Sequence, residues 1–133
     1  MTKTTYTPKK QQLNLEDYPH AIAQARAAIA RCDQRIAVLE ASIEQRNAQF
    51  EKWVADNADL RNDTQRCAAL KEHRYNDAQY QGWLALLQNQ RDKRTQQEIK
   101  LELLRSSFSV AKLQLRQQIA DTVAGNEGLA LVA

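Results

Sequence analysis

Apolar residues recur every seven positions along the first half of the chain. Between residues 21 and 50 this row consists of Ile22, Ile29, Ile36, Ile43 and Phe50. A companion row three positions later consists of Ala25, Cys32, Leu39, Arg46, Trp53 and Leu60. An apolar period of about 3.5 residues is typical of an α-helix that packs along a second helix. The pattern therefore predicts a long helix that starts near Asp17 or Pro19 and has one covered face.

The same period returns in the second half of the chain and predicts a second long helix. Its row consists of Tyr80, Leu87, Arg94, Leu101, Phe108 and Leu115. Asn76 and Asp77 precede this row, and either side chain can cap a helix by accepting hydrogen bonds from the amides of the first turn. We therefore expect the chain to reverse near residue 76, so that the two helices form a long antiparallel, coiled-coil-like hairpin.

A reversal at residue 76 also predicts which residues face each other. Phe108 would meet Ile43, and Arg91 or Arg94 would approach Asp56 or Asp59. The polar stretches around these charges would then lie at the same level, which favours pairing within one chain because an arbitrary register sets polar residues against apolar ones.

An alternative adds a second break near ADNADLRND, residues 55–63. This stretch is polar and rich in Asn and Asp, which favour turns. A break there leaves a short third helix near residues 60–75 between the two long ones. Both versions share one expectation, that Ile22 to Ile43 pack on Leu104 to Ile119.

Composition restricts the fold to the all-α class. Only 3 Gly and 2 Pro are present, and strong helix formers dominate the chain. We expect an extended polar tail at residues 1–15, with Leu13 and Leu15 against the helices. A single α-helical hairpin domain would occupy residues 16–124, followed by an apolar C-terminal tail at residues 125–133, where Gly125 suits a helix C-cap.

The last helix carries a second apolar row on a different face. This row consists of Ile99, Leu103, Val110 and Leu113. Two apolar rows on one helix imply two neighbouring helices. Either the middle helix or the N-terminal tail covers the second row within one chain, or the row is a partner-binding surface for a second copy or for the helix of a partner protein.

Charge excludes some classes of partner and leaves one open. The net charge of +3 results from 19 basic and 16 acidic residues, which are interleaved along the chain. This arrangement does not suit a membrane surface, and the first ten residues lack the apolar core of a secretory signal, so we expect a cytoplasmic protein. Basic spots at RDKRTQQEIK and PKKQQ, with Tyr75, Tyr80 and Trp83 near the hairpin tip, leave nucleic-acid binding as the alternative function.

Catalytic chemistry finds no support in the sequence. His20 and His73 are far apart and have no ligand cluster at metal-binding spacing, so we expect both at the surface. Cys32 and Cys67 both fall on apolar rows and should be buried as small hydrophobic residues. We expect no enzyme activity, cofactor or metal site.

The function expected from these patterns is that of a non-catalytic helical interaction or assembly module. Such a protein acts as an adaptor, a small regulator or a structural component. Its partner would be a second copy, giving a homo-oligomer, or a helical protein, bound through Ile99, Leu103, Val110 and Leu113.

Overall fold

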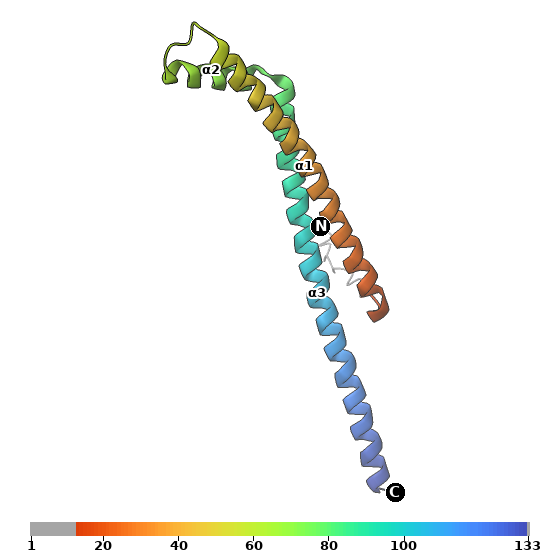
Figure 1. Ribbon diagram of the computed structural model, residues 1–133. Helices are drawn as coiled ribbons and strands as arrows, with labels where there is room; N and C mark the ends of the chain where they lie inside the picture. Colours follow the sequence, from red (N-terminus) through yellow and green to blue (C-terminus); the bar gives the residue numbers. More distant parts are fainter. Residues whose placement is uncertain (1–12, 133) are drawn as a thin grey trace, which may run out of the picture. The chain divides into compact units, whose positions relative to one another are not determined.

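The computed structural model describes the backbone of residues 13–132 and the side chains of residues 13–126. Helices make up 92% of the described chain, in which there are no strands, and this confirms the all-α class. A 3₁₀ turn, η1, precedes three α-helices. Their bounds are Leu15–Asp17 for η1, Tyr18–Asp56 for α1, Asp63–Asn76 for α2 and Ala78–Val132 for α3 (Figure 1).

The chain reverses between α1 and α2, at residues 57–62. The Asn57 side chain accepts a hydrogen bond from the Asp59 amide at 3.1 Å, a local contact that favours a turn over a helix. Asn62 then caps α2 by accepting from the Gln65 amide at 2.8 Å, and the Gln65 side chain accepts in return from the Arg61 amide. The alternative with a short third helix is therefore confirmed, and α2 is that helix.

Asp77 separates α2 from α3 without reversing the chain. Its amide donates to the carbonyl of His73 at 3.1 Å, which ends α2. Its carboxylate accepts from the Tyr80 amide at 2.8 Å, which begins α3. Asp77 is thus an N-cap, as the sequence indicates. The predicted reversal at residue 76 is wrong, because one extended residue (φ −85°, ψ 102°) only bends the path.

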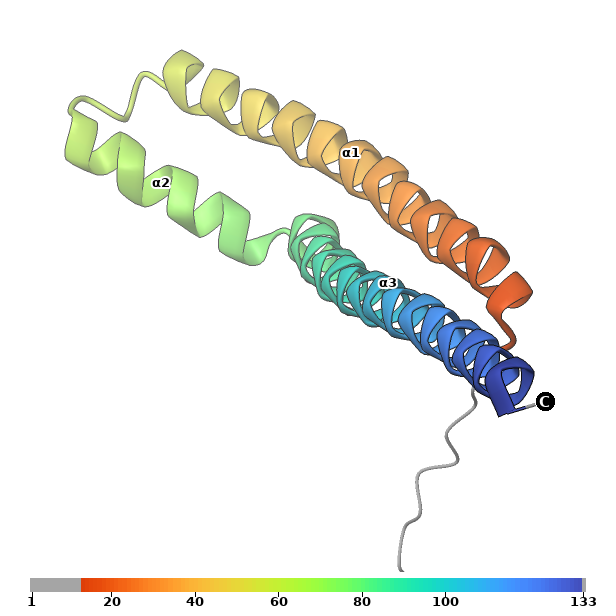
Figure 2. The same cartoon turned by 90° about the horizontal axis from the view of Figure 1, so that it is seen from below.

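The described residues group into two compact units. Residues 25–99 form the middle unit, and residues 13–24 with 100–132 form the terminal unit. Within the middle unit α1 runs antiparallel to both α2 and the start of α3, and Figures 1 and 2 show these helices side by side. Ion pairs define the direction: Glu40 contacts Arg91 at 3.2 Å, and Asp33 contacts Arg94 at 2.5 Å.

These pairs correct the predicted register. Arg94 lies beside Asp33 and Glu98 rather than Asp56 or Asp59. Ile43 lines a surface depression with Leu84 and Leu87. Phe108 stacks on Tyr18, so the predicted pairing of Phe108 with Ile43 is wrong. The turn at residues 57–62 comes earlier than residue 76, and each position of α1 therefore meets an earlier part of the second half of the chain.

The predicted apolar rows do form the covered faces of the middle unit. Its buried residues are Ala25, Cys32, Val54, Tyr80 and Leu87. Val54 takes the place expected for Trp53, which is 48% exposed. Cys32 is buried as predicted, whereas Cys67 is exposed. The prediction for Cys67 is wrong because it assumed a continuous row across the turn, and α2 starts a new helix with its own covered face.

In the terminal unit the start of α1 covers only part of α3. Tyr18 and Leu101 are buried there, and Leu13 and Leu15 are half-buried against α3, as expected. The rest of the predicted N-terminal tail, residues 1–12, lies outside the described residues. Gly125 is inside α3, which continues to Val132, so its predicted role as a C-cap is wrong. None of the described helices is long and apolar enough to cross a membrane.

Candidate interaction surface on α3

Tyr18 marks the last level at which α1 covers α3. Its ring stacks on Phe108 with 5.4 Å between centroids and 15° between planes. The Lys112 ammonium lies 4.4 Å from the centroid of the same Phe108 ring, a cation–π contact. Because α1 begins at Tyr18, the apolar row of α3 has no cover from α1 after this level.

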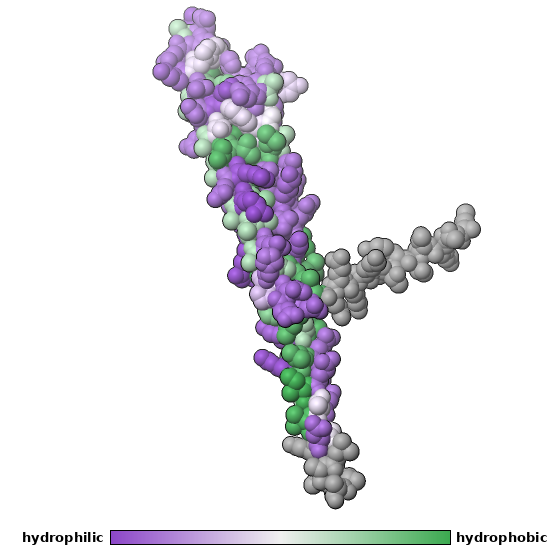
Figure 3. Space-filling view, turned by 90° about the vertical axis from the view of Figure 1, so that its right-hand side faces the viewer, coloured by the Kyte–Doolittle hydropathy of each residue, from purple (hydrophilic) through white to green (hydrophobic). Residues whose placement is uncertain are grey.

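Beyond Phe108 the apolar row of α3 continues past the N-terminal end of α1. All the residues from Lys112 to Asn126 are exposed. Three large apolar side chains prolong the row of Leu101 and Phe108 on the same face of the helix. We call them the uncovered seam: Leu115, Ile119 and Val123, which are 41% to 55% exposed. Figure 3 shows hydrophobic surface gathered along this part of α3.

The row predicted as partner-binding is also exposed. We call Leu103, Val110 and Leu113 the outer stripe; they are 52% to 64% exposed. The fourth predicted residue, Ile99, belongs to the middle unit and is exposed as well. At about 100° per residue, the outer stripe lies on the opposite side of α3 from Phe108 and the uncovered seam. The terminal part of α3 therefore presents apolar side chains on two faces.

An open groove of about 590 Å³ lies between the start of the described chain and α3. Leu13, Leu15 and Tyr18 form one wall. The α3 wall includes Val110 from the outer stripe and Leu115 from the uncovered seam. The groove therefore connects the two exposed rows along one side of the helix.

This part of α3 carries few charges. From Ser109 to Asn126 the charged residues are Lys112, Arg116 and Asp121. Asp121 accepts a hydrogen bond from Gln117 one turn away at 3.0 Å. A nearly neutral helix with two exposed apolar faces is suited to burial against other helices, since a solvated helix surface is normally rich in charge.

Sequence reasoning identified the outer stripe and missed the uncovered seam. Leu115 and Ile119 were recognised as apolar, but the predicted register placed α1 across them. The signal that could have located the turn was the Asn and Asp content of residues 57–63. A turn there shortens the reach of α1 along α3 and leaves the seam uncovered.

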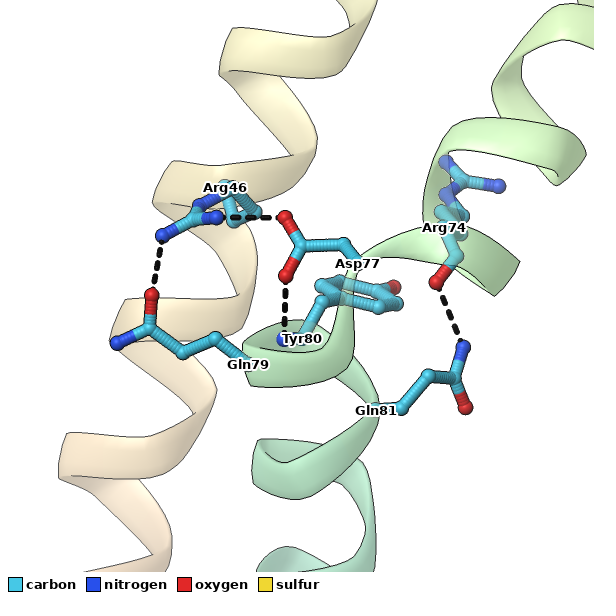
Figure 4. A network of polar contacts seen from close by, with 6 residues as sticks. All are labelled: Arg46, Arg74, Asp77, Gln79, Tyr80 and Gln81. Carbon is cyan, nitrogen blue, oxygen red and sulfur yellow. Dashed lines mark hydrogen bonds and ion pairs between the residues drawn. The ribbon is translucent and has the colours of Figure 1, made fainter.

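Apart from these apolar faces, a group of polar contacts joins all three helices of the middle unit (Figure 4). Arg46 donates to the Asp77 carboxylate at 2.6 Å and to the Gln79 side chain at 2.8 Å. Gln81 donates to the carbonyl of Arg74 at 2.7 Å, across the bend. This arrangement holds α2 and α3 on the same side of α1.

The environment of Asp77 favours its charged form. The pKa of its carboxyl is lowered from 3.8, chiefly because the Tyr80 amide donates a hydrogen bond to the carboxylate. Partial burial opposes this effect on the pKa, and the Arg46 guanidinium adds to it. The ion pair belongs to the scaffold, since both of its members are occupied by contacts within the chain.

His73 packs among aromatic rings, which corrects its predicted place at the open surface. Its ring centroid is 4.1 Å from that of Trp53 and 5.8 Å from that of Phe50. Asn47 supports the same region by accepting hydrogen bonds from Arg74 at 2.9 Å and from the Tyr80 hydroxyl at 3.2 Å. These contacts attach α2 to the end of α1. His20 is exposed, as expected.

The aromatic residues proposed to stack on nucleic-acid bases do not form one exposed group. Tyr75 is 81% exposed, but Tyr80 is buried. Trp83 is half-buried, with the Arg46 guanidinium 5.0 Å from its ring centroid. In the basic run, Arg91 and Arg94 contact carboxylates, so part of its positive charge is neutralised within the chain.

No group of three or more metal-ligating side chains of the His, Cys, Asp or Glu type occurs within residues 13–126. The terminal part of α3 exposes large apolar side chains on two faces, the outer stripe and the uncovered seam. Comparisons of the sequence with models of known protein families and with curated proteins, and of the fold with solved structures, find no match.

Proposed function

We propose that this protein is a non-catalytic helical interaction module that binds a second copy of itself or a helical protein partner through α3. The outer stripe, Leu103, Val110 and Leu113, forms the contact, with Ile99 at its edge. The observation that carries the proposal is the exposure of these large apolar side chains, each more than half exposed although the helix has a well-covered face. Contiguous exposed apolar surface of this kind marks protein interaction sites.

The geometry of α3 supports helix docking over other modes of binding. Together with Ile99, the outer stripe follows spacings of four, seven and three residues, which an α-helix presents along one side. A partner helix can insert its own apolar side chains between such residues. The nearby groove, with Leu13 and Leu15 on one wall, provides additional apolar surface beside Val110.

The test is a double substitution, Leu103→Glu with Val110→Gln. We expect it to abolish retention of a helical partner from a nuclease-treated lysate of the native host, and to lower the molar mass of any assembly that forms through the outer stripe, measured by sedimentation equilibrium. Helix content by circular dichroism should not change, because both residues are exposed in the single chain.

A matched control introduces the same side chains at polar, exposed positions of α3, as Gln96→Glu with Ser109→Gln. The control should assemble like the natural chain. Undiminished assembly by the stripe variant contradicts the proposal. Loss of helix content in the stripe variant alone also contradicts it, because the stripe would then belong to the core of the fold.

Nucleic-acid binding has less support as a second function. Its strongest element is the exposed Tyr75, whereas Tyr80, Arg91 and Arg94 are engaged inside the chain. The discriminating measurement is the affinity for single-stranded DNA or RNA as a function of salt. Binding through phosphate contacts falls steeply with increasing salt concentration, whereas binding through an apolar helix face does not.

A further inference from the structure

The uncovered seam is continuous with an interface that the chain already makes. At Leu101 and Phe108 the same face of α3 is covered by the antiparallel start of α1, and the cover ends with Tyr18. Leu115, Ile119 and Val123 extend this face for about four more turns beyond Phe108. The geometry that accepts one antiparallel helix therefore continues past the end of that helix.

We propose that α3 of a second copy of this chain covers the uncovered seam, in an antiparallel pair centred on Ile119. This inference goes beyond the proposed function, because it adds a second contact on the opposite face of α3 from the outer stripe. The three seam residues are spaced evenly, four apart. Their spacing allows two-fold symmetry: when Ile119 faces Ile119 of the second copy, Leu115 faces Val123 of the second copy. Such a self-complementary contact is what a symmetric dimer requires.

The charges of this segment favour the antiparallel orientation. In the pair centred on Ile119, Arg116 lies at the level of Thr122 of the second copy, and Lys112 lies at the level of Asn126 of the second copy. A parallel pair in register would bring each basic side chain to the level of its own counterpart. Staggering like charges along an interface reduces their repulsion, which helps to select one orientation.

The N-terminal segment of the same chain is a poorer occupant. Residues 1–12, MTKTTYTPKKQQ, contain three Lys, no acidic residue and only Met1 and Tyr6 as large apolar side chains. The uncovered segment of α3 has two basic residues and one acidic residue, so the charges of the two segments do not complement each other. A second α3 instead contributes the apolar surface that matches the seam.

The contact is small for a protein interface. Residues 109–126 span about 27 Å at a rise of about 1.5 Å per residue, and only one face of each helix takes part. Stable dimers bury about 800 Å² on each partner, which places this pair at the lower end. We therefore expect dissociation constants on the order of micromolar and mass that depends on concentration.

The first experiment compares the natural chain with Ile119→Arg at up to about 100 µM by sedimentation equilibrium. The natural chain should approach the mass of two chains, and Ile119→Arg should remain a single chain. Gln114→Arg is the matched control, since it introduces the same side chain at an exposed position away from the seam. The control should dimerise. Circular dichroism establishes that all three chains are equally helical.

The second experiment measures orientation by disulfide cross-linking. Single cysteines are introduced as Leu115→Cys in one chain and Val123→Cys in another, with Cys32→Ala and Cys67→Ser in both. A disulfide forms when the Cα atoms come within about 4.4–6.8 Å. In an oxidised mixture the antiparallel pair should yield chiefly the mixed dimer, joining residue 115 of one chain to residue 123 of the other. Predominant linkage of Leu115→Cys chains to one another would overturn the antiparallel pair.

The outcomes separate this inference from the proposed function. Dimers lost in Ile119→Arg, with the mixed disulfide, support the seam pair, and loss of partner binding in the Leu103→Glu, Val110→Gln variant supports the proposed function. Dimers that survive Ile119→Arg but disappear in the Leu103→Glu, Val110→Gln variant overturn the seam pair and support the outer stripe. A chain that stays single at about 100 µM, yet binds a helical partner in a stripe-dependent way, also overturns the second copy while the proposed function stands. Failure of both self-association and partner binding overturns both.

Discussion

Tyr18 and Phe108 stack with ring centroids 5.4 Å apart, and this contact sets how far α1 reaches along α3. On one side of this contact α1 covers the apolar row of α3, as the burial of Leu101 indicates. On the other side every residue from Lys112 to Asn126 is exposed. The position of one aromatic pair therefore separates the part of α3 that α1 covers from the part that α1 leaves exposed.

The first prediction concerns this aromatic pair. Tyr18→Ala should lower the free energy of unfolding by about 2–4 kcal/mol, because it removes a buried ring and its stacking contact with Phe108. Urea denaturation followed by circular dichroism measures the change. Tyr75→Ala is the control: Tyr75 is 81% exposed, and its loss should alter stability by less than about 0.5 kcal/mol. Equal losses of unfolding free energy in Tyr18→Ala and Tyr75→Ala would contradict the end of the α1 cover at Tyr18 and Phe108.

The second prediction compares two leucines on opposite faces of α3. Leu101 is 8% exposed and Leu103 is 64% exposed. Leu101→Ala should reduce the free energy of unfolding by about 2–4 kcal/mol, whereas Leu103→Ala should cost less than about 1 kcal/mol in a dilute, unassembled sample. Thermal unfolding at low protein concentration distinguishes them. A large loss for Leu103→Ala would mean that the outer stripe is covered within one chain.

The third prediction tests the register through Arg94. A double-mutant cycle of Arg94→Gln with Asp33→Asn should give a coupling free energy of about 0.2–1 kcal/mol, as is usual for a partly exposed ion pair. The same cycle with Asp56→Asn should give a coupling near zero. Coupling to Asp56 in place of Asp33 would restore the register that a reversal at residue 76 implies.

The fourth prediction is the pH dependence conferred by Asp77. Its pKa is lower in the folded chain than the ordinary value of 3.8, so the unfolded chain binds more protons in this range. The stabilising effect should be complete above about pH 4 and disappear as the pH falls through the lowered folded value. Urea denaturation at a series of pH values should thus show the natural chain losing its advantage over Asp77→Asn below pH 3.8.

Arg46→Gln provides the matched comparison for the pH experiment. It removes the guanidinium from Asp77 but keeps the hydrogen bond from the Tyr80 amide, the main cause of the lowered pKa. The Arg46→Gln chain should therefore have a higher free energy of unfolding than the chain with both Arg46→Gln and Asp77→Asn. The difference should be smaller than the one between the natural chain and Asp77→Asn. A constant difference between natural and Asp77→Asn chains at every pH would refute the assignment.

The sequence predicted the helices and their covered faces because these properties are local. The rows through Ala25 and Cys32, and through Tyr80 and Leu87, are the buried rows of the structure. A seven-residue apolar spacing determines which side of a helix becomes covered, whatever helix covers it. The capping role of Asp77 was equally readable, since a helix cap depends on residues within one turn.

The register was outside what the apolar spacing could determine. Two helices with seven-residue repeats can slide past each other by a whole repeat and still match apolar to apolar, so several registers have similar packing energies. Polar contacts and the turn selected one of them. Asn62 begins α2 early, and Arg46 and Asn47 then join α1 to the bend at Asp77 and to Tyr80.

The sequence by itself therefore determined an all-α chain, the apolar face of each long helix and the excess apolar surface of α3. Only the tertiary structure decided that α1 ends its cover at Phe108 and that Leu115, Ile119 and Val123 are exposed. The physical reason is that apolarity is a property of each side chain, whereas exposure depends on which residues meet it. That pairing follows from a turn held by a few directional hydrogen bonds. The apolar spacing of a helix contains no information about where such a turn lies.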